Sequence, residues 1–122
     1  MAVILVADDD PVSHRILEYM LGRLGHTVLR AMNGQEALDQ LEAAPADLLI
    51  LDLAMPVMDG LSVLRSLRAD DRFRTLPIIL LTASGLERDE RTARAEGASE
   101  VLTKPFRSQE LIEKLNALLR TS

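Results

Sequence analysis

Four short apolar runs in this chain each lead into residues that could bind a metal ion or a phosphate group. The run at residues 2–7 leads into Asp8, Asp9 and Asp10, the run at 48–51 into Asp52, the run at 78–81 into Thr82, and the run at 101–103 into Lys104 and Pro105. If the runs are parallel strands of one sheet, these residues converge on its carboxyl edge, where open α/β sheets bind ligands. The chemistry of the chain therefore depends on whether the runs form such a sheet.

Asp8, Asp9 and Asp52 would place three carboxylates at the ends of two strands. Hard oxygen ligands of this kind suit Mg²⁺, and clustered carboxylates without a cation repel one another. The formal charges of three aspartates, one Mg²⁺ and Lys104 sum to zero. A phosphoryl group of about −2 in place of the Asp52 charge leaves a residual charge that donors such as the Thr82 hydroxyl can stabilise. These residues are consistent with a metal-assisted phosphoryl site.

Each of these residues also has a purely structural interpretation. Aspartates before Pro11 can cap a helix and interact favourably with its dipole, and Asp52 can occupy a turn at the end of a strand. Thr82 can be an ordinary strand residue, and Lys104 can be solvated in a loop. The joint occurrence of all of them in this order is more specific than any one of them.

The hydrophobic pattern of the segments that must position these residues alternates between a strand period and a helix period. Short apolar runs are typical of parallel strands covered on both faces, and the stretches between them have helical spacing. The first helix is predicted to have an N-cap at Asp10, Pro11 at its first position and a stop at Gly25, and a strand is predicted at residues 27–30. A capping box of Asn33 and Glu36 opens a helix to about Ala43. A third helix follows Gly60 and ends near Asp70–Asp71, and Ser108 is the predicted cap of the last helix. The order βαβαβαβαβα predicts parallel strands with right-handed crossovers and one α/β domain over residues 1–122.

Two of the predicted helices differ in how much apolar surface they can bury. Val12, Ile16, Leu17, Met20, Leu21 and Leu24 mark one apolar face of the first helix. The segment from Leu86 to Glu96 has almost nothing large and apolar after Leu86, and it carries the acid-first i,i+4 pairs Glu87–Arg91 and Glu90–Arg94. Such a helix buries little, which is typical both of a solvated surface helix and of an element that shifts at small cost.

The composition excludes several classes of function. With 48% hydrophobic and 27% charged residues, the chain has ordinary globular usage. A net charge of −5 argues against nonspecific nucleic-acid binding, and the absence of cysteine excludes disulfides and thiol chemistry. The apolar run at residues 2–7 is too short for a signal peptide or a membrane span, so we expect a cytoplasmic protein without membrane association. His14 and His26 show no metal-ligand spacing and are predicted to lie on the surface.

Four motifs together resemble one known family over essentially the whole chain. They are VADDDP at residues 6–11, LDLAMPVMDG at 51–60, LLTA at 80–83 and TKPF at 103–106. The chain resembles the response-regulator receiver domain of two-component signalling, in particular the single-domain type of the chemotaxis regulators. This resemblance implies a flavodoxin-like (βα)5 three-layer sandwich, with a five-stranded parallel sheet in the order 2-1-3-4-5.

The resemblance also implies a role for each site residue. Asp52 is the expected phosphoacceptor, which receives its phosphoryl group from the phosphohistidine of a sensor histidine kinase or phosphotransfer protein. Asp8 and Asp9 are expected to organise Mg²⁺, with Asp9 as a direct ligand, and the backbone carbonyl of Ala54 is expected to complete the protein ligands with Asp52. Thr82 and Lys104 are expected to contact the phosphoryl oxygens, and Lys104–Pro105 is expected to be a cis peptide bond.

Three features set this chain apart from the usual family pattern. Val101 occupies the position where the family usually has an aromatic switch residue, so a signal must travel through Thr82 and its loop or through another element. Ala54 and Ser84, at positions where the family tunes dephosphorylation, are both small. The chain ends with its last helix, so we expect no DNA-binding output domain and no direct DNA binding. The expected downstream partner is a protein, bound by the helix from Leu86 to Glu96, by Val101 and by the helix from Arg107 to Leu119.

Competing functions differ from this prediction at identifiable positions. Phosphatases of the haloacid dehalogenase type also phosphorylate a strand-end aspartate, but they need a second aspartate two residues later, where this chain has Ala54. A receiver-like scaffold that works without phosphorylation remains the main alternative, although every site position is filled. An FMN-binding flavodoxin is disfavoured by the few aromatic residues and the acidic first loop. The predicted function is therefore a phosphoacceptor switch with slow self-dephosphorylation rather than a dedicated enzyme.

Overall fold

The structure, a computed structural model, describes residues 1–121 and contains one five-stranded sheet. The strands are β1 (Val3–Ala7), β2 (Thr27–Ala31), β3 (Leu48–Asp52), β4 (Ile78–Thr82) and β5 (Glu100–Thr103); the helices are α1 (Pro11–Arg23), α2 (Gly34–Ala43), α3 (Gly60–Arg68), α4 (Glu87–Ala95) and α5 (Ser108–Thr121), with a 3₁₀ turn at Asp71–Phe73. All strand pairs are parallel, and the order is β2-β1-β3-β4-β5. The predicted fold class and strand order are confirmed.

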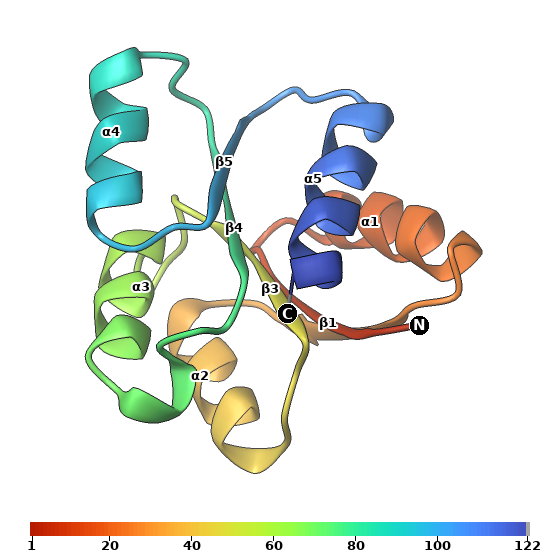
Figure 1. Cartoon of the computed structure of the whole chain (residues 1–122), viewed down its shortest axis with the longest axis horizontal. Coiled ribbons are helices and arrows are strands. Elements are labelled where there is room, and N and C mark those ends of the chain that lie inside the picture. The colour runs from red at the N-terminus through yellow and green to blue at the C-terminus, as the bar shows by residue number, and fades with distance from the viewer. Residues whose placement is uncertain (122) are drawn as a thin grey trace.

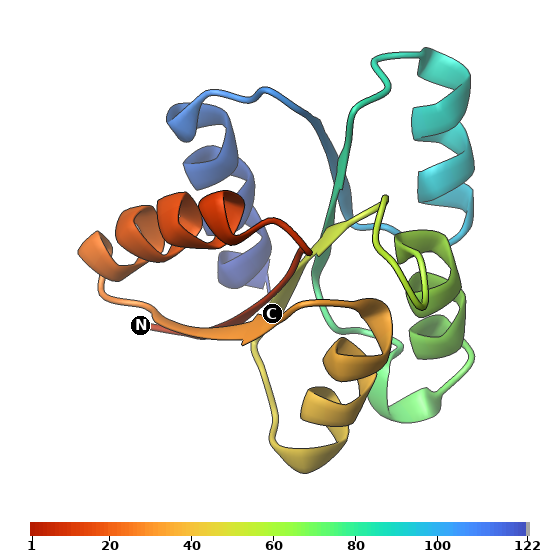
Figure 2. The same ribbon diagram turned by 180° about the vertical axis from the view of Figure 1, so that it is seen from behind.

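The sheet is the middle of three layers. Helices α1 and α5 cover one face, and α2, α3 and α4 cover the other (Figure 1, and from behind in Figure 2). Each face has its own apolar cluster, one containing Leu17, Leu21 and Leu115 and the other containing Leu41 and Leu64. Every residue of β3 and β4 is buried. Because both faces are covered, these strands are continuously apolar up to the polar residue at the carboxyl end of each.

The helices of the first half begin at side-chain caps. The carboxylate of Asp10 accepts the amide N–H of Val12 (2.9 Å), and the side-chain oxygen of Asn33 accepts that of Glu36 (2.9 Å). Asp59 caps α3 in the same way. Such caps satisfy amides that the first turn leaves without partners. The predicted caps at Asp10 and Asn33 are confirmed, whereas Ser108, predicted as a cap, is itself the first residue of α5.

Helix α1 buries a narrower stripe than its apolar residues predict. His14, Leu17 and Leu21 are its buried residues, while the side chains of Val12 and Ile16 are exposed. The residues at 14, 17 and 21 follow the helical repeat and face the sheet, so Val12 and Ile16 are turned outward. Ile16 lines an open groove of about 600 Å³ between α1 and α5. No helix within residues 1–121 is long and apolar enough to cross a membrane.

Helix α4 has little buried surface, as predicted. Ala93 is its one buried residue within the described chain. The predicted pairs Glu87–Arg91 and Glu90–Arg94 form, with nitrogen–oxygen distances of 3.5 and 3.3 Å. These exposed pairs contribute only a few tenths of a kcal/mol each. Helix α4 is therefore held on the sheet by little apolar contact.

Candidate functional site

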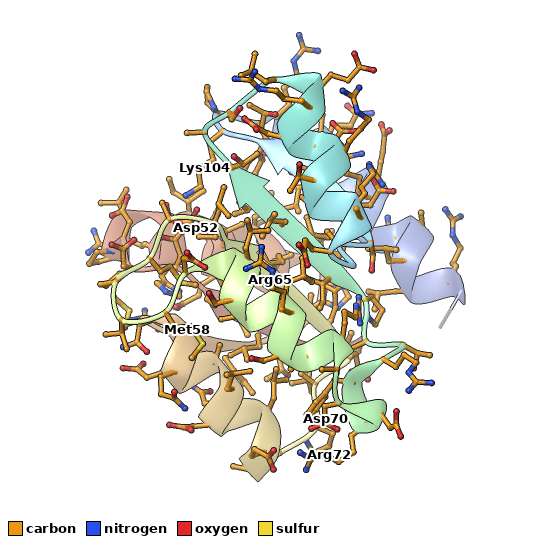
Figure 3. The ribbon with its side chains drawn as sticks, turned by 90° about the vertical axis from the view of Figure 1, so that its left-hand side faces the viewer. Asp52, Met58, Arg65, Asp70, Arg72 and Lys104 are labelled. Atoms are coloured by element: carbon orange, nitrogen blue, oxygen red, sulfur yellow. The ribbon has the colours of Figure 1, made fainter. Side chains whose placement is uncertain are left out.

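The polar residues that follow the four apolar runs meet at the carboxyl edge of the sheet. Ala7 of β1 pairs with Leu51 of β3, so Asp8 and Asp52 follow directly beside each other. Thr82 ends β4, and Lys104 follows β5. Figure 3 shows Asp52 and Lys104 at one end of the strands and the Asp70–Arg72 ion pair near the other end. The convergence predicted from the sequence is confirmed.

Three carboxylates form a compact group at this edge. One oxygen from each of Asp8, Asp9 and Asp52 lies within 4.8 Å of the others. Asp8 and Asp52 are buried, and Asp9 is exposed. Oxygens at this separation can contact one small cation together, and an all-carboxylate set is the hard donor set that Mg²⁺ prefers. The three residues therefore fit the metal that the sequence predicts.

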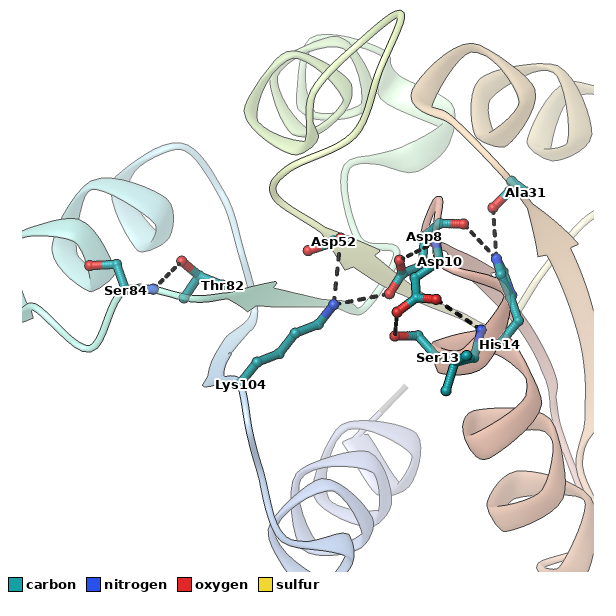
Figure 4. Close-up of polar contacts among 10 residues, drawn as sticks. Asp8, Asp10, Ser13, His14, Ala31, Asp52, Thr82, Ser84 and Lys104 are labelled. Carbon is teal, nitrogen blue, oxygen red and sulfur yellow. Dashed lines mark hydrogen bonds and ion pairs between the residues drawn. The ribbon is translucent and has the colours of Figure 1, made fainter.

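Lys104 provides the positive charge of the group. Its Nζ lies 3.1 Å from Oδ2 of Asp8 and 3.5 Å from Oδ2 of Asp52 (Figure 4). Partial burial lowers the pKa of Lys104, but the hydrogen bond to Asp8 and the charges of Asp52 and Asp8 outweigh it and raise the pKa. The lysine is therefore held as an ammonium ion between the two carboxylates. Lys104–Pro105 is a cis peptide bond, as predicted.

Asp52 lies in an environment that opposes its negative charge. Burial raises the pKa of its carboxyl group, and the charge of Asp8 raises it further; Lys104 and the backbone amide of Ala54 act in the opposite direction and do not fully compensate. A carboxylate that lacks compensating charge gains from any cation placed beside it. The electrostatics of Asp52 therefore support a cation site next to this residue.

Thr82 lies at the same edge but does not join the carboxylates. Its Oγ1 accepts the amide N–H of Ser84 at 3.0 Å (Figure 4). The Thr82 carbonyl oxygen accepts the amide N–H of Lys104 at 2.7 Å, which ties β4 to the residue after β5. The hydroxyl hydrogen of Thr82 is not used by the Ser84 contact, so it is available to donate to an added group.

Comparison with known proteins agrees with this geometry. A family model of the response regulator receiver domain matches residues 4–116. The chain belongs to this family. It is 41% identical to chemotaxis protein CheY1 of Helicobacter pylori strain J99, and the match covers 98% of each protein. It is 34% identical to protein PilH of Pseudomonas aeruginosa, again over 98% of each. Against PhoP of Bacillus subtilis the identity is 38%, and the match covers 49% of that longer protein.

Solved receiver domains have the same fold. The receiver domain of the Francisella response regulator 1452 superposes with a TM-score of 0.93 at 32% identity, over 100% of both chains. The receiver domain of sensor histidine kinase PA1611 from Pseudomonas aeruginosa superposes with a TM-score of 0.89 at 34% identity, over 98% of both chains. That structure has a magnesium ion coordinated in its active-site cleft.

Val101 distinguishes this receiver domain at the position of the usual aromatic residue. Its side chain is buried against β4 and α4, where it joins an apolar cluster with Leu80 and Ala93. A cavity of about 90 Å³ remains beside it, lined also by Thr82 and Asp89. Val101 is therefore a buried part of the face that the sequence predicts for a protein partner, and its role in partner binding stays a prediction.

His14 is a residue of this receiver domain that sequence reasoning placed wrongly. It was predicted to lie on the surface, but its side chain is fully buried. Its Nε2 lies 2.6 Å from the carbonyl oxygen of Asp8 and 3.2 Å from that of Ala31 (Figure 4). The one available signal was its place in the helical repeat with Leu17 and Leu21. His26 is half-buried, and its Nδ1 accepts the amide N–H of Ala2 at 3.0 Å.

Proposed function

We propose that residues 1–122 act as one phosphorylatable receiver domain in which Asp52 is the phosphoacceptor. The observation that carries this proposal is the convergence of Asp8, Asp9, Asp52 and Lys104 at one sheet edge, where 7% of the surface of Asp52 is exposed. The donor is the phosphohistidine of a histidine kinase or a phosphotransfer protein. The role of each residue follows from its position and charge.

The proposed transfer leaves little covalent work for the protein. A carboxylate oxygen of Asp52 forms a bond to phosphorus while the nitrogen–phosphorus bond of the donor breaks, and the electron pair returns to the donor imidazole. Positioning and charge neutralisation carry such reactions. Lys104, already between the two buried carboxylates, can pair with a phosphoryl oxygen, and the Thr82 hydroxyl can donate its hydrogen to another.

The metal site proposed for this reaction uses Asp8, Asp9 and Asp52 together with the backbone carbonyl of Ala54. The donor set is all oxygen, and the raised pKa of Asp52 reflects burial and a neighbouring negative charge that a cation would offset. When bound, Mg²⁺ supplies positive charge against the carboxylates and the phosphoryl oxygens. The magnesium ion in the PA1611 receiver domain supports this assignment by similarity.

The proposed output is a change in affinity for a protein partner at α4 and α5. Helix α4 can move at small cost because Ala93 is its one buried residue in the described chain. Glu100 of β5 connects the two helices, since its Oε1 lies 3.1 Å from Arg94 Nη2 and 2.9 Å from Lys114 Nζ. A displacement of α4 therefore alters a charged surface that continues onto α5.

The test of this function is labelling by a small phosphodonor. Wild-type protein, Asp52→Asn and Asp39→Asn are incubated with acetyl phosphate and Mg²⁺, and the intact mass of each is measured. Asp39 is an exposed aspartate on α2 and is the matched control. We expect one phosphoryl group on wild type and on Asp39→Asn, and none on Asp52→Asn. Equal labelling of Asp52→Asn would overturn the assignment, and unlabelled wild type would favour the scaffold alternative.

A further inference from the structure

His14 is a buried polar residue for which the proposed phosphoryl transfer has no direct use. It lies in the first half of α1, and its side chain is fully buried. Both neighbours of Nε2 are carbonyl oxygens, of Asp8 and of Ala31, and carbonyl oxygens can only accept. Nε2 therefore carries the hydrogen and donates it, with the shorter contact to Asp8.

The Asp8 carbonyl belongs to the peptide that joins Asp8 to Asp9. Because a peptide unit is planar, holding this carbonyl oxygen also sets the direction in which the chain continues to Asp9. The carboxylate of Asp8 accepts the amide N–H of Asp10, which belongs to the next peptide, at 2.9 Å. The backbone N–H of His14 donates to the carbonyl of Asp10 at 3.2 Å. His14 thus contacts the loop of residues 8–10 through both its side chain and its backbone.

The second acceptor anchors this loop to a neighbouring strand. Ala31 is the last residue of β2, and its carbonyl oxygen also accepts the amide N–H of Asp8 at 3.1 Å. The imidazole therefore bridges the end of β1 and the end of β2, which pair at Ala7 and Ala31. A loop fixed to two strands leaves its carboxylates little freedom to move apart.

The burial of His14 has a cost that packing alone would avoid. Within the described chain, Nδ1 is buried and has no hydrogen-bond partner. A buried polar atom without a partner is unfavourable, whereas an apolar side chain could fill the same space without that cost. The neighbouring buried positions of the helix, Leu17 and Leu21, are filled in this apolar way. Filling space beneath α1 therefore does not account for a histidine at position 14.

We propose that His14 is a positioning residue of the phosphoryl site: its Nε2–H fixes the Asp8–Asp9 peptide and thereby sets where the Asp9 carboxylate meets those of Asp8 and Asp52. The inference rests on the proposed function, because it assigns the loop a metal-binding role. Asp9 is the exposed member of the three carboxylates, so its placement depends most on the backbone that carries it.

The test compares two side-chain amides of different length, each substituted for His14 in the full chain. In His14→Gln the side-chain amide nitrogen is separated from the backbone by the same number of bonds as Nε2 of histidine. In His14→Asn the side chain is one carbon shorter. Mg²⁺ affinity is titrated for each by NMR without any phosphodonor. We expect His14→Gln to bind Mg²⁺ like wild type and His14→Asn to bind roughly tenfold more weakly, as for other residues that orient metal ligands. Leu41→Ala, which thins the core at α2, is the control for lost stability alone and is expected to keep wild-type affinity.

A second measurement follows the proton directly. The ¹⁵N shifts of the wild-type imidazole should show a proton on Nε2 and none on Nδ1. If His14→Asn does not fold, His14→Leu, which buries no unpaired amide, makes the same comparison with His14→Gln. If His14→Asn or His14→Leu binds Mg²⁺ as tightly as wild type, the inference is overturned. It is also overturned if His14→Gln loses as much Mg²⁺ affinity as those variants. Wild-type protein that binds Mg²⁺ but is not labelled on Asp52 would overturn the proposed function and leave this comparison intact.

Discussion

The hydroxyl of Ser84 donates a hydrogen bond to the carboxylate of Asp89, with 2.5 Å between Oγ and Oδ2. The same hydroxyl accepts the amide N–H of Leu86 at 3.2 Å. Leu86 is the N-cap residue of α4 and makes no side-chain capping bond. The Ser84–Asp89 pair therefore ties the turn before α4 to the first turn of the helix, whereas Asp10, Asn33 and Asp59 accept first-turn amides of the earlier helices directly.

Ser84→Ala is expected to loosen the start of α4. The variant loses both bonds of the hydroxyl, which together resemble a helix cap worth about 1 kcal/mol. Hydrogen exchange of the α4 amides should accelerate, while exchange in α1 should not change. Ser66→Ala, on the exposed side of α3, is the control and should leave α4 as in wild type. Unchanged α4 exchange in Ser84→Ala would contradict the capping role.

The Ser84–Asp89 pair also connects the phosphoryl site with α4, in a chain that has Val101 at the position of the usual aromatic residue. Thr82 Oγ1 accepts the Ser84 amide, and Ser84 Oγ contacts Asp89, so a reorientation of the Thr82 hydroxyl acts on α4 through two hydrogen bonds. We expect beryllofluoride, a phosphoryl mimic, to shift the amide resonances of α4 in wild type and to shift them by less than half as much in Asp89→Ala. Shifts of wild-type size in Asp89→Ala would show that the signal travels by another route.

Asp52→Asn is expected to stabilise the protein in the absence of divalent cations. Burial and the charge of Asp8 raise the pKa of Asp52. A carboxyl group whose folded-state pKa is raised destabilises the fold once the pH exceeds its unfolded-state pKa of about 3.9. At pH 7 in EDTA, removing the charge should therefore raise the free energy of unfolding by on the order of 1 kcal/mol. Urea denaturation measures this difference.

Mg²⁺ should reverse the order of stability of wild type and Asp52→Asn. Ligand binding to the folded state adds stability according to its affinity, and Asp52→Asn has lost one of the three carboxylates of the group. Wild type should therefore gain more from saturating Mg²⁺ than the variant does. Asp39→Asn should follow wild type in both buffers. A variant that is less stable than wild type in EDTA would contradict the electrostatic account of Asp52.

The sequence predicted the elements of the site better than their side-chain contacts. Asp8, Asp52 and Lys104 could be placed at one edge because the ends of parallel strands meet wherever the strands pair. The strands themselves were recognisable because burial on both faces makes them continuously apolar. These features depend on the order of residue types along the chain and on little else.

The contacts that were missed depend on the rotation of single elements. Each residue turns a helix by about 100°, so the apolar residues of α1 were compatible with more than one buried stripe. The structure buries His14 and exposes Val12 and Ile16. Two backbone carbonyls hold His14, and a sequence pattern cannot show where carbonyl oxygens converge. The Ser84–Asp89 bond was missed for the same reason, because it depends on how α4 begins.

Gly60→Ala is expected to disturb the phosphoryl site by displacing α3 from β3. A Cβ at position 60 would lie 2.5 Å from the carbonyl oxygen of Asp52 and 2.8 Å from Cα of Leu53. Both are backbone atoms, which cannot move aside as a flexible side chain can. The amide N–H of Gly60 also donates to the Leu53 carbonyl at 2.9 Å. We expect a loss of about 1 to 3 kcal/mol of stability from overpacking, together with slower labelling by acetyl phosphate.

Gly22→Ala is the matched control for this substitution. Gly22 lies in α1, and within 4 Å a Cβ there would meet no described atom other than those of its chain neighbours and of the adjacent helix backbone. Alanine in place of a helical glycine stabilises by about 0.5 to 1 kcal/mol. The two glycine-to-alanine changes should therefore have opposite signs in urea denaturation. A Gly60→Ala protein as stable as wild type would show that the backbone at the end of β3 can move to make room for the added Cβ.

Glu100 is expected to give the α4–β5–α5 surface a pH-dependent contribution to stability. Partial burial raises the pKa of Glu100, but its hydrogen bonds from Lys114 and Arg94 outweigh this and lower the pKa. A lowered folded-state pKa stabilises the protein above the unfolded value of about 4.3, and the contribution disappears as the pH falls through the folded-state pKa. Because all three side chains are partly exposed, we expect less than about 1 kcal/mol.

Glu100→Gln tests this contribution by difference. At pH 7 the variant should be less stable than wild type, and the gap should narrow as the pH is lowered from about 5 to 3, because wild type then loses the same charge. High salt should also narrow it, since the partly exposed charges are screened. Glu113→Gln, on the exposed side of α5, is the control and should show no such gap. A gap that stays constant from pH 7 to pH 3 would mean that Glu100 acts through packing rather than charge.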